Sequence, residues 1–237
     1  MTKKILSNIV TTLGVITDDV KLTFNEKGLT SKSVDSAHVS MVDVFIPSTM
    51  FNEYTVEGTE IIAVGMSKLK DVASLGDNDT EIDVETVDGK LCFKIGKIKR
   101  STALLDGSNM SEPKIPNMQL PVSISMPVND LQVISKGTDG IAEALTMTAN
   151  EDGLKIDGIG DLDAISMWLP KDVMKEYIAT EEYKSLYSLD YIASIFKSIK
   201  KDTVIKLEMD TDKPIRISYT IDDMTVMYML APRIEND

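Results

Sequence analysis

The chain has 237 residues, of which 43% are hydrophobic and 27% charged, and its formal net charge is −13. This is the composition of a folded protein with enough length for two buried cores, and it excludes an intrinsically disordered chain. No run approaches the roughly 18–20 apolar residues of a membrane span, and the polar-interrupted N-terminal segment is unlike a signal peptide. We therefore expect a cytoplasmic protein with no membrane partner.

Most of the chain alternates apolar and polar residues with a period of two, as β-strands do. In the first half we expect strands at 20–24, 39–46, 81–87, 90–95 and 100–105. In the second half we expect them at 122–126, 144–148, 164–169, 203–209, 215–221 and 224–230. Turn sequences such as EKG at 26–28 and VDG at 87–89 separate the strands, which predicts mostly antiparallel sheet.

Four segments show helical spacing of apolar residues instead. They cover 3–13, 66–74, 128–136 and 189–201, so each half of the chain carries two helices. The last segment is the clearest, because it begins behind Ser188, a candidate N-cap. Its apolar face consists of Leu189, Ile192, Ile195, Phe196 and Ile199.

The second half of the chain is a diverged copy of the first. NEKGL at 25–29 returns as NEDGL at 150–154, and a segment beginning IP and ending EY at 46–54 returns at 169–177 as one beginning LP and ending EY. A repeat of this length is too long for a solenoid unit and long enough to be a domain. We therefore expect an α+β fold of two similar domains, each with antiparallel sheet and two helices. The predicted boundaries are 1–106 for the first domain, 107–121 for a connecting loop and 122–237 for the second domain.

Lysines concentrate on the predicted helices. The four helical segments hold eight lysines and three aspartates, a sum of +5, so the rest of the chain carries −18. The lysines are Lys3, Lys4, Lys68, Lys70, Lys136, Lys197, Lys200 and Lys201. Lysines on solvated helix faces are common, and that interpretation stays open. The alternative is a phosphate-facing surface within an acidic body that repels DNA elsewhere.

The predicted connecting loop is rich in proline. Pro113, Pro116 and Pro121 favour an extended, solvent-facing segment. It also contains Ile115, Met118 and Leu120, which a plain spacer does not need. The loop is either a spacer or a clip that lies over a pocket.

The sequence contains no recognisable catalytic motif. His38 is the only histidine, which excludes a histidine metal cluster. The only cysteine, Cys92, lies in the apolar run LCF at 91–93, and we expect it to be buried and inert. Phosphate-binding loops, dinucleotide-binding turns and CxxC pairs do not occur. We therefore expect a binding protein that is not an enzyme and has no cofactor.

Acidic pairs offer the one enzyme-class alternative. Asp161 with Asp163, or Glu181 with Glu182, could form a carboxylate pair or a magnesium site in an acid-rich hydrolase. In a chain with 38 acidic residues, a solvated surface is the simpler interpretation.

Several segments resemble one protein family. YMLAPRIE at 228–235 closely resembles the C-terminal segment of the proliferating cell nuclear antigen family of DNA sliding clamps. VDSAHVSMV at 34–42 resembles the first-domain strand and loop of that family, and LYSLDY at 186–191 resembles its final inner helix. With Met126-Pro127 at the start of the second domain, the resemblance covers nearly the whole chain. Among the members of that family, the chain is most similar in character to archaeal or archaeal-virus proteins.

The resemblance implies a homotrimeric ring of six domains around double-stranded DNA, with the eight helix lysines facing the DNA without sequence preference. Such a ring is a processivity factor in DNA replication and DNA repair, nucleoid-associated in an archaeal cell. Its partners would be a clamp loader, DNA polymerase, flap endonuclease and DNA ligase, which dock through a short peptide motif. The alternative within binding proteins is a clamp paralogue or peptide-docking scaffold in a heterotrimer, with reduced DNA engagement.

The resemblance also places a partner-peptide pocket and the subunit contacts. The pocket walls would be Val34, His38, Val39, Pro214, Ala231, Pro232 and Arg233, closed by Ile115, Met118 and Leu120 of the connecting loop. An aromatic side chain of the peptide would fill this apolar pocket. Ring closure would pair an edge strand near 100–105 with one near 173–178 of the next subunit.

The first copy departs from the family pattern at its start. Positions matching the strand at 122–126 fall at or before Met1, so we expect the opening strand to be absent and the first helix to begin almost at once. A start assigned too late or a divergent viral or plasmid clamp would each produce this. The paired lysines of the family's first helix are replaced by Ser7 and Asn8.

Overall fold

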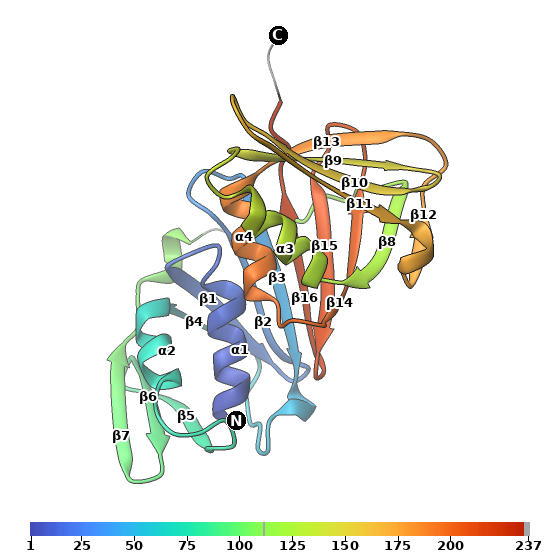
Figure 1. Cartoon of the computed structure of the whole chain (residues 1–237). Helices are drawn as coiled ribbons and strands as arrows, with labels where there is room; N and C mark the ends of the chain where they lie inside the picture. Colours follow the sequence, from blue (N-terminus) through green and yellow to red (C-terminus); the bar gives the residue numbers. More distant parts are fainter. Residues whose placement is uncertain (111, 235–237) are drawn as a thin grey trace. The chain divides into compact units, whose positions relative to one another are not determined.

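The computed structural model of the protein describes residues 1–110 and 112–234 (Figure 1). Ser111 of the predicted connecting loop, Glu235 of the YMLAPRIE segment and the last two residues lie outside this description. The chain divides into two compact units. The first is Met1–Lys114 with Asp222–Val226, and the second is Ile115–Ile221 with the described part of Met227–Asp237.

The first unit packs α1 (Lys3–Leu13) beside α2 (Met66–Ala73) (Figure 1). One group of its strands pairs antiparallel in the order β4-β1-β2-β3. These are β1 (Asp19–Asn25), β2 (Gly28–Val34), β3 (Ser40–Pro47) and β4 (Glu60–Gly65). A second sheet has the order β5-β6-β7. Its members are β5 (Ile82–Val87), β6 (Lys90–Ile95) and β7 (Ile98–Ala103), and the short 3-10 helices are η1 (Ser48–Met50) and η2 (Gly107–Asn109).

The second unit packs α3 (Asn129–Thr138) beside α4 (Leu189–Ser198) (Figure 1). One sheet has the order β11-β10-β9-β13. Its strands are β9 (Ala144–Asn150), β10 (Gly153–Ile159), β11 (Ala164–Pro170) and β13 (Tyr183–Ser188), with η3 (Lys171–Val173) after β11. The other strands follow the order β12-β8-β14-β15-β16. They are β8 (Val122–Pro127), β12 (Glu176–Ile178), β14 (Val204–Met209), β15 (Ile215–Ile221) and β16 (Met224–Leu230).

The two units share one topology, which confirms the predicted duplication and the α+β class. The order β13-β9-β10-β11 repeats β4-β1-β2-β3, and β14-β15-β16 repeats β5-β6-β7. The second unit extends its sheet with β8 and β12 on the outer side of β14. Among the described residues of the first unit, no strand takes the corresponding places beside β5.

The first helix begins at Lys3, as the sequence predicted. At the place that corresponds to the end of β8, Thr2 forms an isolated bridge with Glu81. The Met1 amino group donates to the Ile82 carbonyl at 2.9 Å, and the Ile82 amide donates to the Met1 carbonyl at 2.7 Å. The residues of this bridge therefore lead directly into the helix.

Helix burial follows the predicted apolar stripes. In α4 the side chains of Leu189, Ile192, Ile195 and Phe196 are buried, and Ser188 occupies the N-cap position without a side-chain capping bond. The helix is shorter than predicted, because it ends at Ser198 and not at 201. Gln132 of α3 fixes this end by donating to the carbonyl oxygens of Phe196 (2.8 Å) and Ile199 (2.9 Å). No described helix is long and apolar enough to cross a membrane.

Apolar spacing did not predict some of the strands, and it predicted another at shifted residues. The apolar spacing did not indicate β2, β4, β10 and β13, and it placed β7 two residues too late; β12 lies within the edge strand near 173–178 that the family resemblance implied. In β2 and β13 most of the buried positions are occupied by serine or tyrosine, so the alternation of apolar and polar residues is weak. In β4 the run EIIAVG is apolar without alternation. Periodicity alone cannot assign such strands.

Candidate functional site

Exposed lysines lie on α2, α3 and α4, opposite the buried stripe of each helix. Lys68 and Lys70 are exposed on α2, on either side of the buried Leu69. Lys136 of α3 and Lys197 of α4 are exposed in the last turns of their helices. A cation in that position is favoured by the helix dipole, so the same lysines serve helix stability and surface charge.

Lys3 and Lys4 are engaged within the first unit. Lys3 Nζ donates to the Gly76 carbonyl at 2.7 Å, and Lys4 Nζ lies 2.8 Å from an Asp222 carboxylate oxygen. The Lys4 and Asp222 side chains are 50% and 44% exposed. Exposed pairs of this kind contribute roughly 0–1 kcal/mol, so a phosphate can compete for either lysine.

Lys200 and Lys201 do not lie on a helix, contrary to the sequence prediction. They stand in the turn between α4 and β14, where the Thr203 amide donates to the Lys200 carbonyl at 3.0 Å. Both side chains are exposed. The turn extends the row of cations beyond Lys197 and the end of α4.

The acidic residue of α2 has its own partner. Asp71 forms an ion pair with Arg100 of β7. This pairing offsets the one negative charge on the helix that carries Lys68 and Lys70. Because Arg100 neutralises Asp71, the net charge around α2 is more positive than a count of the charged residues of α2 alone suggests.

Asp35 shapes the loop between β2 and β3. Its buried carboxylate accepts hydrogen bonds from the amides of Ala37 (3.1 Å), Val39 (2.8 Å) and Ser40 (2.7 Å). His38, at the turn, has a φ of 58° and an exposed side chain. Three bonds from one carboxylate fix this turn and leave the imidazole free to contact a ligand.

The flanking residues predicted as pocket walls are partly accessible. Val34 ends β2 and Val39 precedes β3, and both are half-buried. The sequence reasoning did not single out Asp35 as the organiser of this loop. An aspartate followed within five residues by a serine and a strand is too common a pattern to reveal it.

In the second unit, three predicted pocket residues lie at one end of two neighbouring strands. Pro214 precedes β15, while Ala231 and Pro232 follow β16, which lies next to β15. All three are half-buried. The Arg233 amide donates to the Leu186 carbonyl at 2.7 Å, which ties the tail back to β13.

Arg233 itself points its side chain toward Glu143. Arg233 Nη1 lies 3.6 Å from the Glu143 carboxylate and 3.3 Å from the Glu143 carbonyl oxygen. The Arg233 side chain is 46% exposed and the Glu143 side chain 91% exposed, so this contact is weak and leaves the guanidinium available to a partner.

The connecting segment is anchored by Arg216, which the sequence reasoning missed. Arg216 Nη2 donates to the Met118 carbonyl at 3.1 Å, and Nη1 lies 3.3 Å from a Glu208 carboxylate oxygen. Ile115, Met118 and Leu120 are half-buried. Because Arg216 sits two residues after Pro214, it brings Met118 to the end of the sheet that carries the other second-unit wall residues.

Val34, His38 and Val39 belong to the first unit, and the remaining wall residues belong to the second. A single pocket formed by both groups stays a prediction.

Groups considered for catalysis are spread over the surface. Asp161, Asp163, Glu181 and Glu182 are exposed, and among the described residues no three His, Cys, Asp or Glu side chains form a group able to hold a metal ion. The expectation of a buried Cys92 is wrong, because alternation along β6 puts its neighbours in the core and leaves the thiol half-exposed.

Two strands end their sheets and carry exposed apolar side chains. In the first unit β7 is an edge strand with Ile98 49% exposed, and in the second β12 is an edge strand with Ile178 57% exposed. Val173, just before β12, is 62% exposed. Unpaired edges with apolar side chains are suited to pairing with another chain.

Comparison with known proteins identifies the family. Residues 1–101 match "Proliferating cell nuclear antigen, N-terminal domain" and residues 114–234 match "Proliferating cell nuclear antigen, C-terminal domain". A protein named DNA polymerase sliding clamp from Methanothrix thermoacetophila is 31% identical over 236 residues, which are 98% of this chain and 96% of the relative. One of the same name from Methanosarcina barkeri is 32% identical over 239 residues, 99% and 97% of the two chains.

A solved structure agrees with the sequence relatives. The structure described as "C-terminal region of FEN-1 bound to A. fulgidus PCNA" matches with a TM-score of 0.92 at 27% identity, over 100% of this chain and 98% of that one. A structure of PCNA from Thermococcus kodakaraensis shares the fold with a TM-score of 0.89 at 20% identity. The chain therefore belongs to the proliferating cell nuclear antigen family of DNA sliding clamps.

Proposed function

We propose that the chain is the subunit of a DNA sliding clamp that encircles duplex DNA and tethers DNA polymerase to it. The observation that carries this proposal is the duplicated clamp fold, matched over both domains, with exposed lysines on helices of both copies. The role is one of binding and not of catalysis. Processivity then comes from topology, so affinity for DNA can be low and must be independent of sequence.

The lysines are suited to loose contact with phosphates. Those on α2, α3 and α4 are exposed, and those of α1 are held only by exposed partners. Few, solvated cations attract the backbone without fixing a register on the DNA, whereas many direct contacts would arrest movement. This supports sliding and disfavours a stationary complex.

We propose that three chains close the ring through the edges of β7 and β12. Each edge is unpaired within the described part of its own sheet and carries an exposed isoleucine. Pairing β7 of one chain with β12 of the next satisfies backbone groups and buries apolar surface. Sedimentation at micromolar concentration should show a trimer; a stable monomer would contradict this arrangement.

We propose that polymerase, clamp loader, flap endonuclease and ligase bind through a short peptide at the predicted partner-peptide pocket. Support comes from the ordered His38 loop in one unit and the Arg216-anchored connecting segment in the other. In a relative, the A. fulgidus protein, the C-terminal region of FEN-1 is bound. An aromatic plug in such a pocket is a usual hot spot.

A processivity assay tests the function. Addition of the clamp with its loader should lengthen the products of a cognate polymerase on primed circular DNA. The triple variant Lys197→Glu, Lys200→Glu and Lys201→Glu should reduce loading and retention while leaving partner-peptide binding intact.

A matched control has the same change in charge. It reverses Lys27, Lys155 and Lys184, which are exposed and lie on no helix. Equal loss of retention in both triple variants, or equal loss of peptide binding and retention in the first, would refute the assigned surfaces. No gain in product length with an intact trimer would refute the processivity role.

A further inference from the structure

β4 and β13 are equivalent edge strands, one in each unit. Each lies at one end of the strand order of its sheet. In the first unit the Leu105 amide, just after β7, donates to the Ala63 carbonyl of β4 at 2.8 Å. In the second unit the Arg233 amide, in the tail after β16, donates to the Leu186 carbonyl of β13 at 2.7 Å. The repeat offset of 123 residues makes Ala63 and Leu186 counterparts, so the two edges match at this position.

In the second unit, the turn between β14 and β15 closes the rest of this edge. The Asp212 amide donates to the Lys184 carbonyl at 3.3 Å. The Lys184 amide donates to the Thr211 hydroxyl oxygen at 3.2 Å. Both backbone groups of Lys184 that face the open side of the sheet are therefore paired within the unit.

Two hydroxyl side chains of β13 hold that turn in place, and β4 has neither of them. The Ser185 and Tyr187 hydroxyls donate to carbonyl oxygens of the turn, at 2.9 Å and 3.0 Å. Their counterparts in β4 are Ile62 and Val64. Isoleucine and valine side chains cannot donate hydrogen bonds, so β4 cannot hold a turn against its edge in this way.

In the first unit, the backbone of Ile61 is open. Ile61 is the counterpart of Lys184 and lies two residues before Ala63. Alternate residues of an antiparallel strand direct their backbone groups to the same side, so the amide and carbonyl of Ile61 face the open side together with the Ala63 carbonyl. No described residue forms a hydrogen bond with either group.

The turn that corresponds to residues 210–213 bonds elsewhere. It is a tight two-residue turn between β5 and β6, with a φ of 49° at Asp88 and 69° at Gly89. The Gly89 carbonyl accepts a hydrogen bond from the Leu104 amide at 3.3 Å. The turn therefore contacts the segment after β7 and leaves the backbone of β4 unpaired.

This open edge does not depend on β8 or on what precedes Met1. In the second unit β8 pairs with β12 and β14, and the bonds to Lys184 come from the turn instead. The edge of β4 is open because Ile62 and Val64 stand where β13 has hydroxyl residues.

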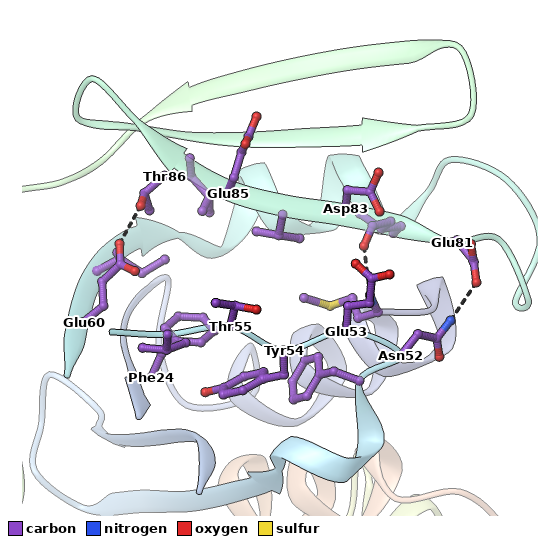
Figure 2. Close-up of a pocket in the computed structure, with 17 residues that line it drawn as sticks. Phe24, Asn52, Glu53, Tyr54, Thr55, Glu60, Glu81, Asp83, Glu85 and Thr86 are labelled. Carbon is purple, nitrogen blue, oxygen red and sulfur yellow. Dashed lines mark hydrogen bonds between the residues drawn. The ribbon is translucent and has the colours of Figure 1, made fainter. Parts of the chain in front are cut away.

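Exposed apolar side chains border the open edge. Ile61 is 57% exposed, Val87 43% and Leu105 42%. Hydrogen bonds join the segments that carry them, because the Leu105 amide bonds to β4 and the Thr86 hydroxyl donates to the Glu60 carboxylate at 2.6 Å, at one end of the pocket drawn in Figure 2. An apolar residue placed opposite Ile61 would bury part of this surface.

The charge around the edge is negative. Residues 57–61, 85–90 and 104–106 contain a single lysine, Lys90, and five carboxylates. The carboxylates are Glu57, Glu60, Glu85, Asp88 and Asp106. A segment that binds here is therefore favoured when lysine or arginine flanks its apolar residue.

We propose that the open edge of β4 binds an extended segment of a partner protein, with an apolar residue opposite Ile61 and lysine or arginine on either side of it. Exchange of both backbone bonds with Ile61 supplies the pairing, and the apolar and acidic surroundings supply specificity. The site lies wholly within the first unit and uses none of the predicted walls of the partner-peptide pocket. It does not require DNA.

A labelled peptide tests the proposal. The probe is fluorescein-Lys-Val-Lys-Val-Lys-amide, titrated with the full chain and followed by fluorescence anisotropy. We expect saturable binding of one peptide per chain, because the equivalent edge in the second unit is closed. A peptide with glutamate in place of lysine should bind at least about tenfold more weakly. No saturable binding, or equal binding of both peptides, would overturn the proposal.

Methylated peptides separate strand pairing from attraction to the acidic surface. A residue opposite Ile61 carries its side chain on the same face as Ile61 and makes both backbone bonds to it. N-methylation of the valine amides removes these donors, whereas N-methylation of the lysine amides is the matched control that keeps them. We expect at least about a tenfold loss of affinity for the first peptide and clearly less for the second. Equal losses, or none, would refute strand pairing.

Two variants of the chain exchange the residues of the two units. Ile61→Lys introduces the residue that the second unit has at an exposed position, so the unfolding temperature should stay constant while the lysine peptide binds at least about tenfold more weakly. Lys184→Ile gives the second unit the apolar side chain but leaves its edge closed, so the stoichiometry should remain one. Unchanged affinity in Ile61→Lys, or two bound peptides in Lys184→Ile, would overturn the proposal.

A second copy of the chain is the other possible occupant of this edge. In that case Ile61→Lys would reduce the size of the assembly in sedimentation relative to the unmodified chain, and this result would overturn the assignment to a partner protein. We expect the assembly to be unchanged.

Discussion

Replacing Arg216 by alanine should loosen the connecting segment and weaken partner-peptide binding together. Its side chain is 22% exposed and makes two contacts, to the Met118 carbonyl at 3.1 Å and to Glu208 at 3.3 Å. Hydrogen bonds with a charged partner contribute about 1.5–3 kcal/mol when buried, and less with solvent access. Glu208 keeps Lys206 at 3.0 Å, so no carboxylate is left unpaired. We expect a loss of about 1–2 kcal/mol in unfolding free energy.

The assay measures stability and binding on the same samples. That loss corresponds to a fall of about 2–8 °C in the unfolding temperature. If the connecting segment closes the pocket, the affinity for a partner peptide carrying an aromatic plug should fall about 5- to 30-fold, equivalent to the same 1–2 kcal/mol. Amide hydrogen exchange should rise within residues 115–120 and stay constant in β14.

Lys206→Ala is the matched control for Arg216→Ala. It removes the other cation next to Glu208 and leaves the bond to Met118 intact. Peptide affinity should then stay within about twofold of the parent value, as for a surface charge remote from the ligand. Equal loss of affinity in both variants would show that charge balance around Glu208, and not the connecting segment, controls the pocket.

Three further predictions concern single residues. Asp35→Ala removes three hydrogen bonds from the His38 loop, so peptide affinity should fall while assembly, measured by sedimentation, stays intact. Gly28→Ala should destabilise by at least about 1–3 kcal/mol in thermal or denaturant unfolding, because φ is +140° and a Cβ would lie 2.1 Å from the Ile46 carbonyl oxygen; an unchanged midpoint would contradict this. Burial raises the pKa of Tyr177 and Tyr187 above the usual 10.0, so the native state keeps their protons longer than the unfolded chain does. Unfolding free energy should therefore be insensitive to these groups below pH 10 and fall above it, with a smaller fall in Tyr187→Phe.

The sequence predicted the architecture more completely than it predicted the residues of the candidate site. Long segments with regular spacing, such as α4 and β14–β16, were predicted within a few residues because their apolar stripes become the core. Short strands such as β12, of three residues, exist through pairing with a distant strand, and no local pattern marks them. The repeat compensated for part of this, since one copy indicates what the other should contain.

The residues that organise the candidate site could not be predicted, because their role depends on partners far along the chain. Arg216 looks like an ordinary polar position in an alternating strand, and its bond to Met118 spans 98 residues. Lys200 and Lys201 were assigned to a helix because the heptad-like spacing continues past Ser198. The helix ends where Gln132 of α3 donates hydrogen bonds to the last carbonyl oxygens, and this contact is tertiary.

The acidic excess of the chain has a consequence for how a clamp of this kind reaches DNA. Asp130 and Asp190 lie in the first turns of α3 and α4, where the helix dipole favours an acid, and Asp71 is paired with Arg100. The acids on the helices therefore have local structural roles, and the lysines set the charge there. At moderate salt the Debye length is roughly 8–10 Å, so the lysines attract only phosphates that come this close, while DNA that approaches the rest of the chain meets its net charge of −18. A closed ring should thus bind linear DNA poorly in solution, and only opening by a loader brings the lysines within reach of phosphates. Measurable binding of the closed ring to linear duplex at 0.15 M salt without a loader would contradict this reasoning.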